Sequence, residues 1–159
     1  MPDNLYQKLA AGRALEKEGA EQEAIDYFHK LADEYPDNPL VEFEFGGAYD
    51  FAGQESEAIP HYRRAIELGL PDDELARAYV QLGSSLRNVG EYAEAVNLLT
   101  DACARFPQHR ALRVFLALAQ HSAHQPQAAL VTLLDTLLMD TDKLDGYSRA
   151  IGYYTDELR

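Results

Sequence analysis

Apolar and polar residues alternate along the chain with the periodicity of short amphipathic helices that are separated by brief turns. Between residues 82 and 96, Leu82, Leu86 and Val89 recur at i, i+4 and i+7, which places them on one face of a helix. Gly90 then predicts a helix end, because glycine adopts the left-handed conformation that such an end requires. Acidic residues follow and open a second helix, where the helix dipole favours them. We therefore expect a helical hairpin here.

Gly83 lies inside the first helix of this hairpin. An internal glycine costs roughly 0.5–1 kcal/mol relative to alanine, so its position needs a reason. We expect that a neighbouring helix passes very close to Gly83, where a side chain would leave no room.

The spacing of these small residues recurs along the chain. The frame of Gly83, Gly90 and Ala95 is found again 37 residues upstream, 34 residues further upstream and, in degenerate form, 34 residues downstream. The other frames are Gly12, Gly19, Ala24; Gly46, Gly53, Ala58; and Ala117, His124, Ala129. A large apolar residue follows each final alanine by four positions, at Phe28, Tyr62, Leu99 and Leu133. Such self-similarity indicates a helical repeat array, in which each helix pair buries its apolar face by stacking on its neighbours.

The unit resembles the tetratricopeptide repeat, whose pattern combines Leu-Gly, an aromatic, a small residue, a bulky residue and a closing proline. The third unit carries this pattern most fully, at Tyr79, Leu82, Gly83, Leu86, Gly90, Ala95, Leu99, Ala102 and Pro107. The resemblance implies an all-α solenoid of four helical hairpins, wound as a right-handed superhelix. We expect repeats at about 5–38, 39–75, 76–109 and 110–140, within a single domain that spans 1–159.

An apolar stripe follows the last repeat and consists of Leu144, Tyr147, Ile151, Tyr154 and Leu158. These positions share one face of a helix. We expect a capping helix over 142–158, with Asp142 as its N-cap, because the apolar run at 128–139 needs a cover at the end of the array.

The composition narrows the classes of partner. The formal net charge is −13, which argues against nucleic acid and anionic membrane as partners, since both need a basic surface. The single Cys103 excludes an internal disulfide. No apolar run approaches the ~20 residues of a membrane span, and residues 1–10 lack the pattern of a signal peptide. We expect a cytoplasmic protein.

The chain shows no constellation that is typical of an enzyme. His121 and His124 are three residues apart but have no obvious third metal ligand, which favours exposed histidines near a helix end. The acids at 140, 142 and 145 do not follow the spacing of a calcium loop. The glycines are spread by repeat rather than clustered as a phosphate-binding loop. We expect no catalytic residues, no metal and no cofactor.

The resemblance further implies that the first helices of the repeats line a concave groove that binds extended or helical peptides. The groove-facing positions yield the candidate site residues Tyr6, Arg13, Phe43, Gly47, Asp50, Arg77, Ser84, Arg87, Leu118 and His121. Leu9, Val80 and Val114 share this face, and packing between first helices explains them equally well.

Two features of this face bear on its ligand. Phe43 beside Gly47 is the preferred anchor point, because a small residue one turn from an aromatic leaves a notch. The arginines of the face are better explained as partners of nearby acids than as an anion site. A clamp for chaperone carboxylates is not expected, because the positions that would carry its Lys, Asn and Arg residues are Leu9, Arg13, Glu44 and Gln81 here.

The sequence therefore predicts a non-catalytic interaction module that binds a peptide segment or a partner protein in the groove. A self-associating structural protein is an alternative, with a homodimer formed through the groove or through the helix at 147–158. An enzyme of unrecognised type is the third.

Overall fold

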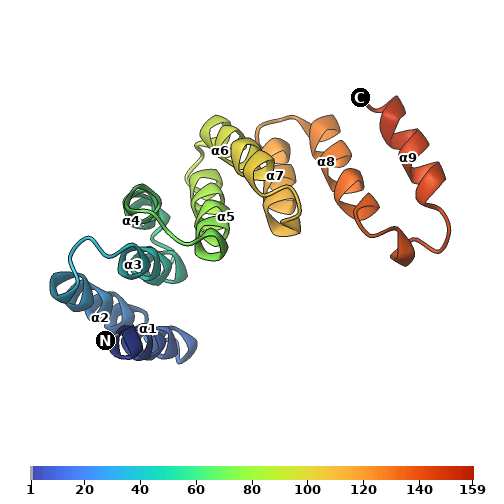
Figure 1. Ribbon diagram of the computed structural model, residues 1–159. Coiled ribbons are helices and arrows are strands. Elements are labelled where there is room, and N and C mark those ends of the chain that lie inside the picture. The colour runs from blue at the N-terminus through green and yellow to red at the C-terminus, as the bar shows by residue number, and fades with distance from the viewer. Residues whose placement is uncertain (1) are drawn as a thin grey trace.

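A computed structural model describes residues 2–159 of the chain, and within this range it contains helices and no strand. The helices form a curved row of antiparallel pairs that runs from the N-terminus to the C-terminus (Figure 1). The prediction of an all-α helical-hairpin solenoid is confirmed.

Consecutive helices form four hairpins, which are followed by a single C-terminal helix. The helices are α1 (Pro2–Lys17), α2 (Glu21–Glu34), α3 (Pro39–Phe51), α4 (Glu55–Leu68), α5 (Asp72–Asn88), α6 (Tyr92–Arg105), α7 (Arg110–Ser122), α8 (Pro126–Leu138) and α9 (Ser148–Glu157). A 3₁₀ turn, η1 (Thr141–Lys143), lies between α8 and α9. We refer to the pairs α1–α2, α3–α4, α5–α6 and α7–α8 as hairpins 1 to 4.

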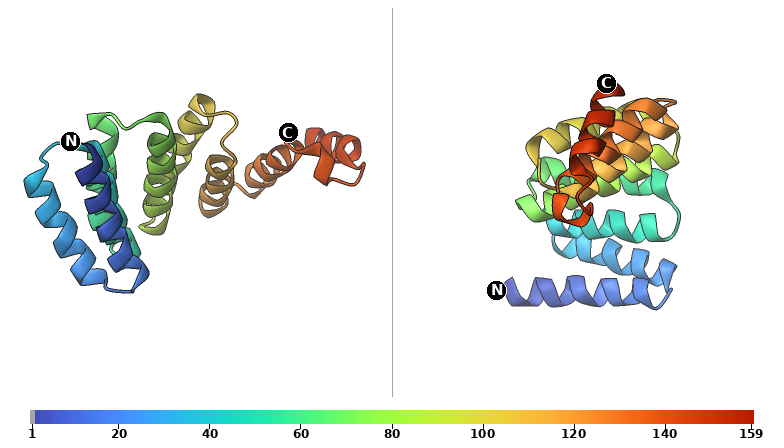
Figure 2. Two further views of the ribbon diagram at one scale, coloured as in Figure 1. Left: turned by 60° about the horizontal axis from the view of Figure 1, so that its bottom comes forward. Right: turned by 90° about the vertical axis from the view of Figure 1, so that its right-hand side faces the viewer.

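The hairpins stack so that the row bends. In Figure 1 the first helices α1, α3, α5 and α7 follow the inner side of the bend, and α2, α4 and α6 follow the outer side. The left view of Figure 2 shows that the row is elongated, with the N-terminal hairpin at one end of it and α9 at the other. The inner side of the bend is therefore built from the helices that carry the predicted groove residues.

The turn inside each hairpin has the same geometry. In hairpin 3, Gly90 has φ of +92°, and the amide of Glu91 donates to the carbonyl of Leu86 at 2.9 Å. In hairpin 4 the corresponding residue is His124, with φ of +60°. A side chain is strained in this region of backbone space. Hairpin 4 thus keeps the turn of the repeat at a conformational cost.

The internal glycines are explained by close packing between the two helices of a hairpin. A Cβ atom at Gly46 would lie 2.8 Å from the ring of Tyr62, and one at Gly83 would lie 2.6 Å from the side chain of Leu99. Both distances are far below van der Waals contact. The expected close approach at Gly83 is confirmed, and Gly12 meets Phe28 in the same way.

The core runs through the stack as two adjoining clusters. One joins hairpins 1 and 2 around Phe28, Val41 and Phe45, and the other extends from Phe43 in α3 to Leu116 in α7. Each of α3, α5 and α7 packs against both helices of the hairpin before it. This arrangement seals the apolar face of one hairpin with the first helix of the next.

The end of the array differs from the prediction. The capping helix is predicted over 142–158 with Asp142 as N-cap, but α9 begins at Ser148. Asp145 and Gly146 precede it with φ of +48° and +84°, and a helix cannot run through two left-handed residues. The predicted apolar stripe is also wrong in part, because Tyr147 and Tyr154 are 68 % and 62 % exposed whereas Thr155 is fully buried.

Among residues 2–159, no helix is both long and apolar enough to span a bilayer.

Candidate ligand-binding groove

A cavity of about 390 Å³ opens among α1, α3, α4 and α5, on the side of the array that the first helices line. Its wall consists of Arg13, Glu16, Phe43, Glu44, Gly47, Asp50, Phe51, Glu55, Tyr62, Arg77, Gln81, Ser84 and Asn88. We call it the groove pocket. Six of the ten predicted site residues meet in it, although they come from three helices, because equivalent positions on stacked first helices face the same way. Those six are Arg13, Phe43, Gly47, Asp50, Arg77 and Ser84.

The other four predicted residues lie outside the groove pocket. Tyr6 and Leu118 are 57 % and 42 % exposed on α1 and α7. His121 lines a separate cavity of about 500 Å³ together with Tyr92 and His124. The guanidinium Nη2 of Arg87 donates to the amide oxygen of Asn88 at 2.9 Å.

Phe43 forms the floor of the pocket rather than an open notch. It is only 4 % exposed, and its ring centroid lies 5.9 Å from that of Tyr62. The guanidinium carbon of Arg77 lies 5.3 Å from the Phe43 ring centroid, which is a cation–π arrangement. The open space expected one turn away is at Gly47, where a Cβ atom would meet nothing within 4 Å.

Arg13 and Glu44 form an ion pair at one side of the pocket. The Nη1 atom of Arg13 lies 2.5 Å from Oε1 of Glu44, and Glu44 is 9 % exposed. A buried carboxylate needs such a partner, because taking its charge out of water is costly. Arg13 therefore compensates the charge of an acidic residue, which is the role that the sequence analysis favoured for it. Leu9, for which packing between helices was one of two explanations, is 2 % exposed and belongs to the core.

Asp50 is held from two directions at the centre of the pocket. The Tyr62 hydroxyl donates to Oδ2 at 3.2 Å, and the Ser85 hydroxyl lies 3.1 Å from Oδ1. Burial raises the pKa of the Asp50 carboxyl, whereas the two hydrogen bonds lower it. Burial, followed by the charge of Asp50, also raises the pKa of Tyr62, so its hydroxyl stays a neutral donor.

Glu16 is the least satisfied acid of the pocket. Its Oε1 atom is buried and has no hydrogen-bond partner among residues 2–159. Burial raises the pKa of Glu16, the nearby Glu44 raises it further, and Arg13 lowers it. The pocket thus holds a carboxylate whose charge the protein itself compensates poorly.

The comparisons with known proteins agree with this architecture. Residues 39–158 match the Tetratrico peptide repeat family, and residues 8–38 match a second Tetratricopeptide repeat family. The chain belongs to the tetratricopeptide repeat family. No curated protein matches the sequence.

Solved structures share the fold of this tetratricopeptide repeat chain. The structure of MamA protein has a TM-score of 0.75 at 21 % identity, with 91 % of this chain and 78 % of that chain covered. YrrB, described as a TPR protein with an unusual peptide-binding site, has a TM-score of 0.71 at 22 % identity, with 92 % and 73 % covered. A Podosopora anserina protein described as a putative kinesin light chain with nearly identical TPR-like repeats has a TM-score of 0.75 at 19 % identity, with 99 % and 92 % covered. These likenesses concern the fold.

Several pocket residues were not among the predicted site residues of this tetratricopeptide array. Phe51, Gln81 and Asn88 each lie one helical turn beyond a predicted residue on the same helix. Including the i+4 neighbour of each predicted residue would have found them. Tyr62 is different, because it comes from a second helix and reaches the pocket through the core position beside Gly46.

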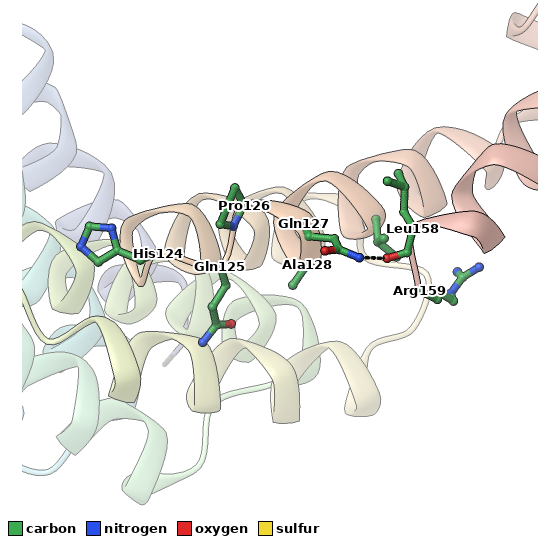
Figure 3. Close-up of a pocket in the computed structure, with 8 residues that line it drawn as sticks. His124, Gln125, Pro126, Gln127, Ala128, Leu158 and Arg159 are labelled. Carbon is green, nitrogen blue, oxygen red and sulfur yellow. Dashed lines mark hydrogen bonds between the residues drawn. The ribbon is translucent and has the colours of Figure 1, made fainter.

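A second cavity lies at the far end of the array. It measures about 670 Å³ and is formed by the start of α8, with Val131, and by the last two residues of the chain. In Figure 3 the side-chain amide of Gln127 points at the Leu158 carbonyl and donates to it. Arg159 also pairs with Asp135 of α8 at 2.6 Å. These contacts tie the chain end to one side of α8.

Within residues 2–159, no group of three or more His, Cys, Asp or Glu side chains is arranged to hold a metal ion.

Proposed function

We propose that this tetratricopeptide array is a non-catalytic interaction module that binds a segment of a partner protein in the groove pocket, and that the segment presents a lysine or arginine there. The observation that carries the proposal is the charge of the pocket. Four carboxylates and two guanidinium groups line it. Glu16, Asp50 and Glu55 form no salt bridge within residues 2–159.

The pocket suits the end of a basic side chain in three ways. The open position at Gly47 leaves space for an entering group. Asp50 has hydrogen-bond partners but no cation, and Glu55 accepts only from the Asn88 amide, at 3.1 Å, among the described side chains. An arriving cation would compensate charges that burial makes unfavourable. The net charge of −13 would also attract a basic segment at long range.

YrrB has the same fold and is described as having a peptide-binding site. This description supports the proposal that the present chain binds a peptide segment. The groove of such arrays is a surface that can accept a chain in extended or helical form. For the present chain, the mode and the basic character of the ligand are both part of the proposal.

The proposal can be tested by selecting peptides that bind the purified chain from a random display library. We expect the selected peptides to be enriched in lysine and arginine. Gly47→Leu should weaken their binding at least about tenfold, which corresponds to about 1.4 kcal/mol, because the new side chain fills the pocket. Phe43 is unsuitable for this purpose, since its loss would damage the core.

The matched controls separate pocket charge from total charge. Asp50→Asn should weaken binding, and Asp101→Asn, which changes an exposed acid of α6 outside the pocket, should leave it unchanged. Peptides without basic residues, or equal binding by Gly47→Leu with an unchanged helical circular dichroism spectrum, would remove the proposal.

A further inference from the structure

We propose that the exposed apolar face at the C-terminal end of the array is an interface between two copies of this chain. The face consists of Leu130, Leu133 and Leu137 on α8 and of Tyr147, Tyr153 and Tyr154 at α9. We call its two parts the leucine stripe and the tyrosine surface. The earlier hairpins show how such a stripe is covered elsewhere in the array.

Leu133 and Leu130 of the leucine stripe are more exposed than their equivalents in the earlier hairpins, where the equivalent of Leu133 is fully buried and that of Leu130 is buried or partly buried. Leu133 corresponds to Phe28, Tyr62 and Leu99, which are all 0 % exposed, yet Leu133 is 39 % exposed. Leu130 corresponds to Ile25 and Ile59, which are 6 % and 8 % exposed, and it is 46 % exposed. The residue types are alike, so the difference lies in what covers them.

The first helix of the following hairpin supplies the cover elsewhere. Helices α3, α5 and α7 each pack on both helices of the preceding hairpin, whereas α9 packs on α8 without a comparable contact with α7. The chain end attaches to Gln127 and Asp135. Asp135 is two residues from both Leu133 and Leu137, which places it on the opposite side of α8 from them. Helix α9 therefore leaves the leucine stripe open.

The tyrosine surface is a suitable counterpart for leucines. Tyr147, Tyr153 and Tyr154 are 68 %, 62 % and 62 % exposed. They border a hollow of about 400 Å³ together with Gly146, Arg149 and Ala150. A hollow walled by tyrosines accepts an aliphatic side chain, and tyrosines are enriched among the residues that dominate interface energies. One chain thus carries both the leucine stripe and a tyrosine-lined hollow that can bind a leucine side chain.

The pairing of a leucine stripe with a tyrosine hollow on one chain points to a second copy as the occupant, and the distribution of charge permits it. Two chains that each carry a net charge of −13 repel one another over most of their surface. Helix α8 contains a single charged residue, Asp135, and Arg159 neutralises it. The leucine stripe is therefore a place where two acidic copies can meet. In a two-fold arrangement, the leucine stripe of each copy would enter the tyrosine surface of the other, so that the same contact forms twice.

Sedimentation equilibrium over a range of concentrations, with light scattering after size exclusion, tests the proposal. We expect a dimer that dissociates on dilution. Leu137→Asp and Tyr154→Ser should each weaken dimerisation at least about tenfold. Leu118→Asp is the matched control, because Leu118 is 42 % exposed, like Leu133, but lies on α7. It should dimerise as the original chain does.

Cross-linking provides a second readout that does not depend on stability. In a Cys103→Ser background, a chain with Leu137→Cys mixed with a chain with Tyr154→Cys should form a disulfide-linked pair. A monomer at all concentrations, or dimerisation that Leu118→Asp abolishes and Leu137→Asp does not, would overturn the proposal. The groove pocket is distant in the array, so Leu137→Asp should keep peptide binding, and the two proposals can fail separately.

Discussion

Hairpins 1 to 3 and hairpin 4 share one residue frame but bury it to different extents. In the first three, a bulky residue on the second helix sits against a glycine on the first and is fully buried, as Leu99 is against Gly83. In hairpin 4, Ala117 stands in place of the glycine, and Leu133 is 39 % exposed. The methyl group takes part of the space, and α9 does not supply the missing cover. Burial in a repeat array therefore depends on the neighbour as much as on the unit.

The largest effect should come from truncating the equivalent bulky residues. Leu99→Ala should lower the free energy of unfolding by about 2–5 kcal/mol, because it leaves a cavity at a site that cannot collapse fully. Leu133→Ala should cost about 1 kcal/mol or less in the monomer, since water already reaches this side chain. Urea unfolding at low protein concentration, followed by circular dichroism, measures both. Equal costs would contradict the comparison between hairpins.

The next largest effect concerns the close approach of the two helices in a hairpin, which substitutions at two adjacent glycines can test. Gly46→Ala should destabilise the chain by about 1–3 kcal/mol, because the new Cβ atom would overlap Tyr62. Gly47→Ala, which meets nothing within 4 Å, should be neutral or gain up to about 1 kcal/mol from helix propensity. Thermal unfolding separates the two. A stabilising Gly46→Ala would show that the hairpins can open without cost.

A smaller effect concerns the turn of hairpin 4. His124→Gly should stabilise the chain by about 1 kcal/mol, because glycine adopts the left-handed conformation of this turn without strain. Gly90→Ala in the equivalent turn of hairpin 3 should cost a similar amount. Urea unfolding of the double variant should show the two changes nearly cancelling, since the turns are far apart.

The smallest effect concerns charge in the pocket of hairpins 1 to 3, and it depends on pH. Since the pKa of Glu16 is raised in the folded state, its contribution to stability is present at low pH and is lost as the pH rises through that pKa. Glu16→Gln should therefore raise the melting temperature slightly at pH 7, and its advantage should shrink as the pH is lowered. The same variant should bind basic peptides more weakly. Asp101→Asn, at an exposed site, serves as the control for both measurements.

The candidate site could be predicted in part from the sequence. The periodicity of first helices brought Arg13, Phe43 and Arg77 together correctly, because equivalent positions in a stack share a face. It did not predict that Arg77 would cover Phe43. Phe43 therefore forms the floor of the pocket, whereas the sequence predicted it as an exposed anchor for a ligand. It also could not reach Tyr62, whose hydroxyl contributes to the pocket from the second helix. Side-chain direction across a hairpin is a matter of packing rather than of spacing.

The sequence by itself determined the repeat, its hairpins and its internal glycines. Small residues at fixed intervals dictate close helix pairs, and local periodicity is sufficient to show them. Only the tertiary structure decided the end of the array. Two left-handed residues, Asp145 and Gly146, redirect the chain before α9, and the ion pair of Arg159 with Asp135 fixes the side of α8 on which the chain end lies. Both features depend on contacts of a segment that has no equivalent elsewhere in the array. No repeated sequence pattern could therefore predict them.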